Sequence, residues 1–168
     1  MPRPAVDIIK FTLDGREVSA PQNMMLVDAA LQFGDVEIPV FCYEPKLGAP
    51  VGACRMCLVE IEGIPKLQAG CSVPVKDGMV VHTDTARVKE AQEAVLEFLL
   101  INHPLDCPVC DKGGECPLQD FSYSFGPNES RMEFSRRVFD GEGVRVTIGE
   151  AGANVALLDV AAAFLDAG

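Results

Sequence analysis

The chain has 168 residues, of which 48% are apolar, and its formal net charge is −11. This length allows one domain with an appendage or two small domains, and the apolar fraction is ordinary for a globular protein. The acidic balance argues against nucleic-acid binding, which depends on Lys and Arg neutralising phosphates. No apolar run approaches the roughly 20 residues that span a bilayer, and no signal region follows Met1, so a cytosol-facing protein without a membrane span is expected.

The first half of the chain predicts a small α+β sheet with one covering helix. Asp14-Gly15 is a turn signal that joins two expected strands. Apolar residues at three- and four-residue spacing then predict a short helix over Met24–Phe33, which Gly34 ends. Residues 35–57 are rich in Pro and Gly and are expected to form a long ordered loop. The predicted strands are Val6–Leu13, Arg16–Ala20, Leu58–Ile61 and Met79–Thr83.

A second, longer helix is predicted to start at a cap on Asp84 or Thr85 and to run to about Ile101. One side of this helix is expected to pack on a neighbour while the other faces water. The packed side consists of Val88, Ala91, Val95, Phe98 and Leu99. The wet side consists of Lys89, Glu90, Gln92, Glu93 and Glu97.

Pro104 ends this helix beside His103, and a Pro/Gly loop is expected over residues 104–120. Beyond Phe121 the sequence patterns that predict secondary structure become weaker. For that region we interpret Gly143–Ile148 as a strand and Val155–Leu165 as a short helix.

All seven cysteines and one of the two histidines fall into two groups of four candidate metal ligands. The first group, with intervals of 11, 2 and 13 residues, consists of Cys42, Cys54, Cys57 and Cys71. The second, with intervals of 3, 2 and 5 residues, consists of His103, Cys107, Cys110 and Cys116. A reducing cytosol and an odd number of cysteines argue against a disulfide framework. Four protein ligands suit an iron–sulfur cluster or a closed zinc site, so two metal centres are predicted.

Small residues precede the C-x2-C pair of the first group. Gly52 and Ala53 let backbone N–H groups approach cluster sulfurs, and such hydrogen bonds help to set a reduction potential. Arg55, inside the pair, either offsets thiolate charge or is a solvated surface residue. The interval between Cys42 and Cys54 is longer than in the plant-type C-x4-C-x2-C pattern, so that pattern is matched only in part.

His103 completes the second group, which otherwise has three ligands. The alternative is an ordinary surface or hydrogen-bonded histidine, which is the interpretation adopted for His82 in its predicted strand. A neutral imidazole in place of a thiolate removes a negative charge and should raise the reduction potential, as in His-ligated two-iron centres. Lys112-Gly113-Gly114 supplies a cation and a flexible backbone nearby, although the glycines could serve only the turn.

Two segments closely resemble the N-terminal part of the large iron–sulfur subunit, often called G, of bacterial NADH:quinone oxidoreductase, the respiratory complex I. The first segment reads Pro50-Val51-Gly52-Ala53-Cys54-Arg55-Met56-Cys57-Leu58-Val59-Glu60. The second is longer and more specific, covers residues 102–119, and contains Cys110-Asp111-Lys112-Gly113-Gly114-Glu115-Cys116. The resemblance covers about residues 5–125.

The resemblance implies a β-grasp ferredoxin-like domain over residues 5–84 with a 2Fe–2S cluster on Cys42, Cys54, Cys57 and Cys71. It implies a small helical domain over residues 85–125 with a 4Fe–4S cluster on His103, Cys107, Cys110 and Cys116. Members of this family relay electrons that a flavin has taken from NADH toward quinone, and the neighbouring flavin- and NADH-binding subunit is the expected partner. The complex would hold the chain peripherally at the cytoplasmic side of the bacterial inner membrane, with no catalytic residue of its own.

Two other interpretations remain open. Diaphorase-type subunits of soluble hydrogenases and NAD-linked formate dehydrogenases share the spacing. The third interpretation is a zinc-stabilised binding module, because zinc is a legitimate metal for both ligand sets. Structural zinc, however, usually takes two close ligand pairs.

Residues 126–168 are expected to be a tail that starts a further domain. Ala156-Leu157-Leu158-Asp159 resembles the approach to the family's next cysteine motif, but no cysteine follows, which suggests a truncated or frameshifted reading frame.

Overall fold

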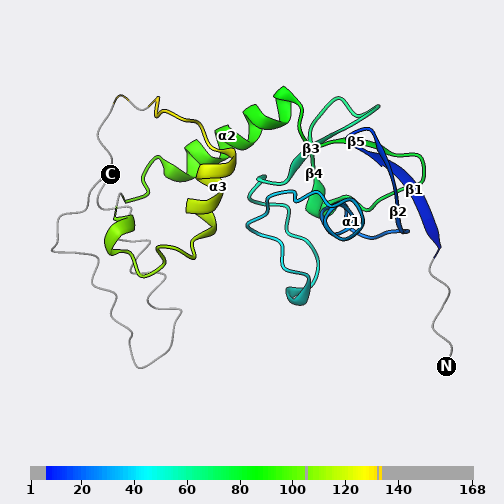
Figure 1. Cartoon of the computed structure of the whole chain (residues 1–168), viewed down its shortest axis with the longest axis horizontal. Coiled ribbons are helices and arrows are strands. Elements are labelled where there is room, and N and C mark those ends of the chain that lie inside the picture. The colour runs from blue at the N-terminus through cyan, green and yellow to red at the C-terminus, as the bar shows by residue number, and fades with distance from the viewer. Residues whose placement is uncertain (1–6, 105, 132, 134–168) are drawn as a thin grey trace. The chain divides into compact units, whose positions relative to one another are not determined.

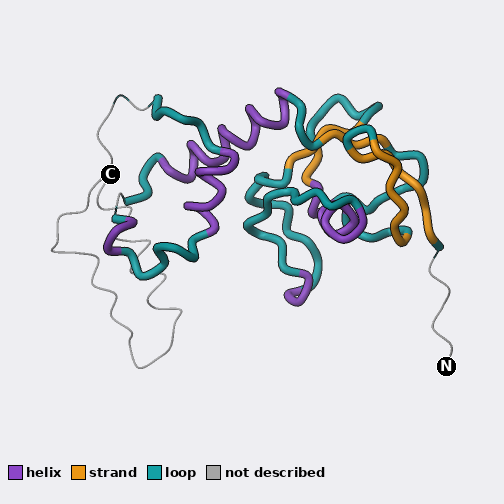
Figure 2. The backbone as a smooth tube through the Cα atoms, viewed as in Figure 1, coloured by secondary structure: helices purple, strands orange, loops and turns teal. Residues whose placement is uncertain are grey.

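Five strands in one mixed sheet and three α-helices make up the part of the chain that the computed structural model describes, residues 7–104, 106–131 and 133 (Figure 1). The strands are β1 (Ile8–Leu13), β2 (Arg16–Pro21), β3 (Leu58–Ile61), β4 (Gln68–Ala69) and β5 (Val80–His82). The helices are α1 (Leu26–Phe33), α2 (Ala86–Leu100) and α3 (Pro117–Phe125), with short 3-10 turns η1 (Pro45–Leu47), η2 (Gly70–Ser72) and η3 (Cys107–Val109). Figure 2 shows that long loops carry most of the chain between α1 and β3 and between α2 and α3.

The sheet has the order β2-β1-β5-β3-β4. β1 and β2 form the predicted hairpin, in which Leu13 pairs with Arg16. The turn residues Asp14 and Gly15 both have left-handed backbones, with φ of 47° and 79°, as a two-residue hairpin of this kind requires. β5 runs parallel to β1 and antiparallel to β3, which makes the sheet mixed. The predicted α+β class is therefore confirmed.

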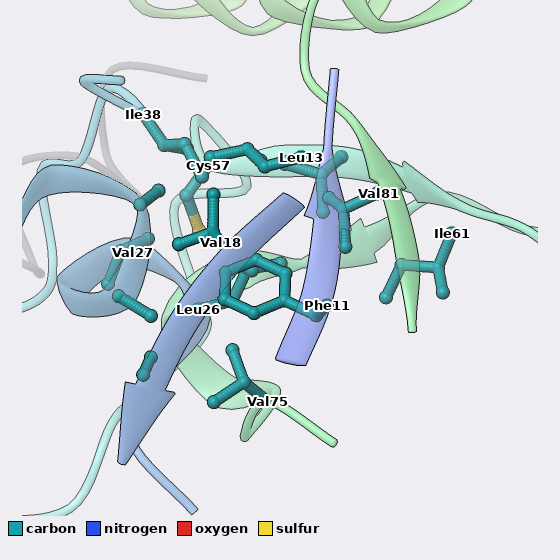
Figure 3. Close-up of a cluster of buried hydrophobic side chains, with 14 of the residues drawn as sticks. Phe11, Leu13, Val18, Leu26, Val27, Ile38, Cys57, Ile61, Val75 and Val81 are labelled. Carbon is teal, nitrogen blue, oxygen red and sulfur yellow. The ribbon is translucent and has the colours of Figure 1, made fainter. Parts of the chain in front are cut away.

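One face of the sheet and the inner side of α1 enclose a single core. Figure 3 shows Phe11 and Val18 from the first hairpin directed toward the same interior as Leu26 from α1. Leu26 and Val81 are completely buried. Burial of an aliphatic side chain of this size contributes about 1.5–3 kcal/mol, so the core holds α1 on the sheet.

The packed face of α2 differs from the predicted stripe. Its buried residues are Val88, Gln92 and Leu96, whereas Phe98 is 75% and Leu99 40% exposed. The prediction was therefore wrong for Phe98, Leu99 and the supposedly wet Gln92. Residues four positions apart lie above one another on a helix, so Gln92 shares the line of contact with its two apolar neighbours despite its amide.

α3 was not predicted, and residues 117–120 are helical where a loop was expected. Pro117 occupies the first turn of this helix, where its fixed φ and missing N–H do no harm. The prediction placed Pro117 in a Pro/Gly loop, whereas this proline marks the start of a helix. The expected strand at Gly143–Ile148 and helix at Val155–Leu165 lie outside the described residues. Among the described helices, none has the length and apolar character to cross a bilayer.

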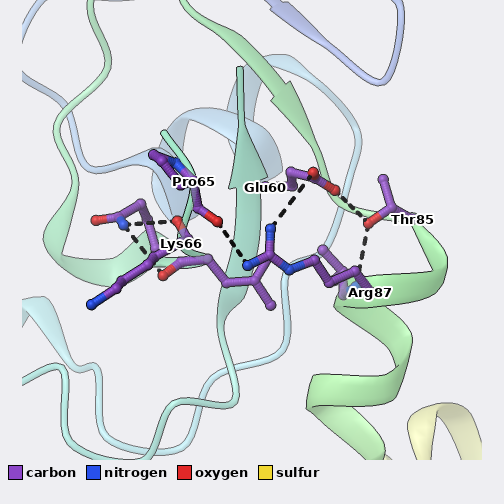
Figure 4. Close-up of polar contacts among 8 residues, drawn as sticks. Glu60, Pro65, Lys66, Thr85 and Arg87 are labelled. Atoms are coloured by element: carbon purple, nitrogen blue, oxygen red, sulfur yellow. Dashed lines mark hydrogen bonds and ion pairs between the residues drawn. The ribbon is translucent and has the colours of Figure 1, made fainter. Parts of the chain in front are cut away.

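Side chains at the start of α2 attach this helix to the sheet (Figure 4). The Thr85 hydroxyl accepts from the Val88 N–H at 3.3 Å and donates to Glu60 Oε2 at 2.9 Å. The Arg87 guanidinium donates to the Pro65 carbonyl at 2.8 Å and lies 4.0 Å from a Glu60 oxygen. Thr85 is therefore the cap, while Asp84 instead pairs with Lys89 at 2.6 Å.

Thr85→Ala should lower the free energy of unfolding by about 1–2 kcal/mol, because the helix loses its cap and Glu60 loses a donor. Thr85→Ser keeps the hydroxyl and should stay close to the wild type. Urea unfolding followed by circular dichroism measures the difference. Equal stability of the alanine and serine variants would show that the cap contributes nothing.

Candidate metal centres

The four cysteines of the first group come from separate segments beside α1. Cys42 lies in the loop after this helix, Cys54 and Cys57 lie just before β3, and Cys71 lies in η2. Cys57 and Cys71 are buried and belong to the hydrophobic core, whereas Cys42 and Cys54 are half-buried. The group therefore lies at the edge of the core, where two of its sulfurs are shielded from water.

Strand register explains how a 13-residue interval brings Cys57 close to Cys71. β3 pairs antiparallel with β4 so that Leu58 faces Ala69. One residue further out, the Gly70 N–H donates to the Cys57 carbonyl at 2.8 Å. Burial, followed by the neighbouring Cys57 side chain, raises the pKa of Cys71 to about 12.

Gly70 makes this close approach possible. A Cβ at this position would lie 3.3 Å from the Cys57 carbonyl oxygen and 3.4 Å from a methyl carbon of Val27. Both distances are tight, so a larger residue would push the hairpin and α1 apart.

Backbone N–H groups of the loop point at cysteine sulfurs, as the small residues predicted. The Cys54 N–H donates to Cys42 Sγ at 3.5 Å, and this bond is the main reason why the pKa of Cys42 is lowered. The Ala53 N–H acts in the same direction, while burial opposes it. The Gly52 N–H likewise acts to lower the pKa of Cys71, although burial outweighs it. These donors stabilise negative charge on the sulfurs that they face.

The loop reaches this conformation through two left-handed residues, Gly52 and Arg55, both with φ of 62°. A left-handed backbone costs a residue with a Cβ roughly 1–2 kcal/mol, so Arg55 is held there by its surroundings. Its side chain is exposed and makes no ion pair with any residue in the described ranges. This favours the solvated interpretation of Arg55.

α1 supports both sides of the first group. The Tyr43 hydroxyl, next to Cys42, donates to Asp28 Oδ2 on this helix. Burial, together with this hydrogen bond, raises the pKa of Tyr43 to about 12. On the Cys71 side, the Leu26 N–H donates to the Val73 carbonyl at 2.9 Å. Sequence reasoning missed Tyr43 and Asp28, and the only signal was one acidic residue in a largely apolar helix.

The second group lies along the loop between α2 and α3. His103 follows α2, and its N–H donates to the Leu100 carbonyl at 3.2 Å. Cys107 begins η3 and Cys116 is the N-cap of α3. A Cβ on Gly113 would lie 2.8 Å from the Cys107 carbonyl oxygen, so the glycine is required by the turn itself. Cys107 and Cys110 are exposed, which leaves their thiols accessible.

The two groups differ in how far the structure draws them together. No three His, Cys, Asp or Glu side chains of the described residues converge at the spacing of a single-ion site. The first group instead forms two contacting pairs, Cys42 with Cys54 and Cys57 with Cys71. A two-iron cluster takes two protein ligands on each iron, so this donor set fits it. The second group shares one loop between helices that contact each other.

Comparison with known families assigns each group to its own cluster-binding region. The family described as "2Fe-2S iron-sulfur cluster binding domain" matches residues 7–86. The family described as "NADH-ubiquinone oxidoreductase-G iron-sulfur binding region" matches residues 92–131. The chain therefore carries a ferredoxin-like region for a 2Fe–2S cluster followed by a region for a 4Fe–4S cluster, and the expected fold class and cofactors are confirmed.

Curated relatives share about half of their residues with this chain over the matched segment. The G subunit of the NADH-quinone oxidoreductase of Streptomyces coelicolor is 52% identical over 139 residues, which are 82% of this chain and 16% of the relative. Its counterpart in Rickettsia felis is 51% identical over 77% of this chain and 19% of its own length. The NADH-ubiquinone oxidoreductase 78 kDa subunit of Candida albicans is 53% identical over 74% of this chain and 17% of its own. The chain thus spans less than a fifth of these relatives.

A solved structure supports the fold. A chain of an NAD+-reducing NiFe hydrogenase in the H2-reduced state matches with a TM-score of 0.62 and 30% identity, over 77% of this chain and 55% of that one. The fold and the two cysteine groups define an iron–sulfur protein with two centres. Within that class, the chain carries the iron–sulfur binding region of NADH-ubiquinone oxidoreductase G and is about half identical to NADH-quinone oxidoreductase G subunits over most of its length.

Tyr43→Phe should lower the free energy of unfolding by about 1–2 kcal/mol, because Asp28 loses its donor in a half-buried position. Tyr123→Phe removes the same hydroxyl from a ring that is 85% exposed and serves as the matched control. Urea unfolding measures both variants. An equal effect of the two substitutions would contradict a structural role for the Tyr43 bond.

Proposed function

We propose that this chain relays electrons from NADH, by way of a flavin in a neighbouring subunit, toward quinone within an NADH-quinone oxidoreductase. One observation carries the proposal: the two family matches follow each other on one chain, and each contains one complete set of four candidate ligands. The relatives, which are named as G subunits of this enzyme, support the assignment to the complex.

We assign the 2Fe–2S cluster to Cys42, Cys54, Cys57 and Cys71. The two contacting cysteine pairs and the N–H donors at Cys42 and Cys71 support this assignment. Cys57 and Cys71 hold their sulfurs in the core, which keeps water from that side of the site. The N–H groups of Gly52 and Cys54 offset negative charge on the sulfurs without any side chain having to move.

We assign the 4Fe–4S cluster to His103, Cys107, Cys110 and Cys116. Their position inside the second family match and the exposure of Cys107 and Cys110 support the assignment. His103 contributes no negative charge when it is neutral, so this ligand set is less negative than four thiolates. Both clusters, when bound, supply the one-electron redox chemistry that protein side chains lack.

The division into residues 5–84, 85–125 and a tail 126–168 is also part of the proposal. The partner that delivers electrons would be the flavin- and NADH-binding subunit, with other subunits of the complex alongside. We place the chain peripherally at the cytoplasmic side of the bacterial inner membrane, held there by the complex.

A second candidate is an electron-input subunit of a soluble hydrogenase. The match to a chain of the NAD+-reducing hydrogenase at 30% identity supports this alternative. The genes beside the coding sequence distinguish the two: respiratory membrane subunits favour the first proposal and hydrogenase subunits the second. A colourless protein containing only zinc would favour a zinc-stabilised binding module instead.

Cysteine substitutions should remove the two centres independently. Cys57→Ser should lose the two-iron signal and keep the four-iron signal, while Cys110→Ser should do the opposite, so each variant is the control of the other. Iron and sulfide analysis with EPR after anaerobic reconstitution measures this. A two-iron signal that survives Cys57→Ser would contradict the ligand assignment.

His103→Cys should lower the midpoint potential of the four-iron centre, because a fourth thiolate adds negative charge. The shift should be on the order of 100 mV, since replacing two thiolates in two-iron centres moves the potential by more than that. A redox titration followed by EPR measures it. His82→Gln is the control, because His82 pairs with Glu62 on the sheet. If the midpoint potential of the four-iron centre stays the same or rises in His103→Cys, the assignment of His103 as a ligand is contradicted.

A further inference from the structure

We infer that the contact between Phe41 and Phe121 positions the two cluster regions relative to each other, an inference that rests on the proposed ligand sets. The ring centroids lie 5.0 Å apart and the ring planes are tilted by 58°. Tilted arrangements at this separation are favourable for aromatic pairs. Phe41 directly precedes Cys42, and Phe121 lies on α3, whose N-cap is Cys116. One contact therefore joins residues close to a proposed ligand of each cluster.

Phe41 differs from its neighbours in where it packs. Val40 and Tyr43 pack against the hydrophobic core of the sheet, whereas Phe41 is not among the described side chains that do so. It is nevertheless only half-exposed. An aromatic ring that does not pack on its own core gains by finding another apolar surface, and Phe121 provides that surface.

Phe121 is supported from its other side. Phe125, one helical turn further along α3, packs edge-on against it with ring centroids 5.8 Å apart and an angle of 78°. α3 in turn contacts α2. Phe121 is therefore packed against Phe125 on one side and offers its other side to Phe41.

The two residues that flank Cys42, Phe41 and Tyr43, contact different helices. Tyr43 binds α1 through Asp28, and Phe41 contacts α3 through Phe121. A movement of α3 would be transmitted through Phe41 to the backbone of Cys42 itself. This adjacency makes the contact suitable for fixing the separation of the clusters, on which electron transfer depends steeply.

The attachment at the start of α2 alone does not fix that separation. Thr85 and Arg87 hold the first turn of the helix to Glu60 and Pro65, and bonds at one end of a helix do not by themselves fix the direction of its far end. A second contact at a distance from the first removes this freedom. Phe41 and Phe121 supply the second contact, so we call them positioning residues and assign them no role as ligands.

The test uses the full 168-residue chain with both clusters reconstituted and reduced. EPR measures the spin–spin interaction between the reduced clusters, and iron analysis measures their content. Phe41→Ala and Phe121→Ala should each abolish the interaction splitting while the signal of each cluster keeps its own g values. The double variant should show no further loss, because either substitution removes the same contact.

Two further variants serve as controls. Phe121→Tyr keeps the ring and should retain the splitting. Tyr123→Ala removes an exposed ring from the same helix and should leave the splitting unchanged. If Phe121→Ala loses iron, the milder variant Phe41→Leu replaces it in the test. A reduced splitting in Phe41→Leu supports the inference, and an unchanged splitting contradicts it.

An unchanged splitting in both alanine variants at full iron content overturns the inference. A wild-type chain with two reduced clusters and no interaction overturns it as well. Neither result affects the ligand assignments, which are tested separately by the iron content of the cysteine variants.

Discussion

The hydrogen bond from the Gly70 N–H to the Cys57 carbonyl closes the hairpin on which the first cysteine group depends. It places Cys57 beside Cys71 and brings both to α1, where a Cβ at position 70 would meet tight contacts. The remaining pair, Cys42 and Cys54, is then held by a loop whose N–H groups face the sulfurs. A Pro- and Gly-rich loop has little regular structure of its own, so its conformation depends on contacts with the core.

α1 is the element that supplies those contacts. Its inner side fills the core of the sheet, and its Asp28 and Leu26 bind the segments on either side of the group. Among the described residues of the second region, no comparable cluster of buried apolar side chains forms. Its histidine and cysteines lie on a loop between α2 and α3, and α3 has no fully buried residue. We therefore expect the second region to depend more strongly on its cluster for order, because metal binding contributes directly to folding free energy.

Sequence patterns predicted the sheet-forming half well because its signals are local. The Asp14-Gly15 turn, the alternation of β1 and the spacing in α1 each act within a few residues. α3 was missed because residues 104–120 were interpreted as one Pro/Gly loop, and the packed face of α2 was wrong because Gln92 is buried by its neighbours. The second error concerns which surface a helix packs against, and that depends on residues distant in sequence.

The sequence by itself determined the candidate chemistry of this protein: two sets of four candidate ligands, their order, and the family that their spacing resembles. The spacing is a property of the covalent chain and needs no fold to be recognised. Only the tertiary structure decided that the first set forms two pairs, that α1 carries the loop through Tyr43, and that Phe41 meets Phe121. These contacts join residues far apart in the chain, so they exist only once the core has brought their segments together.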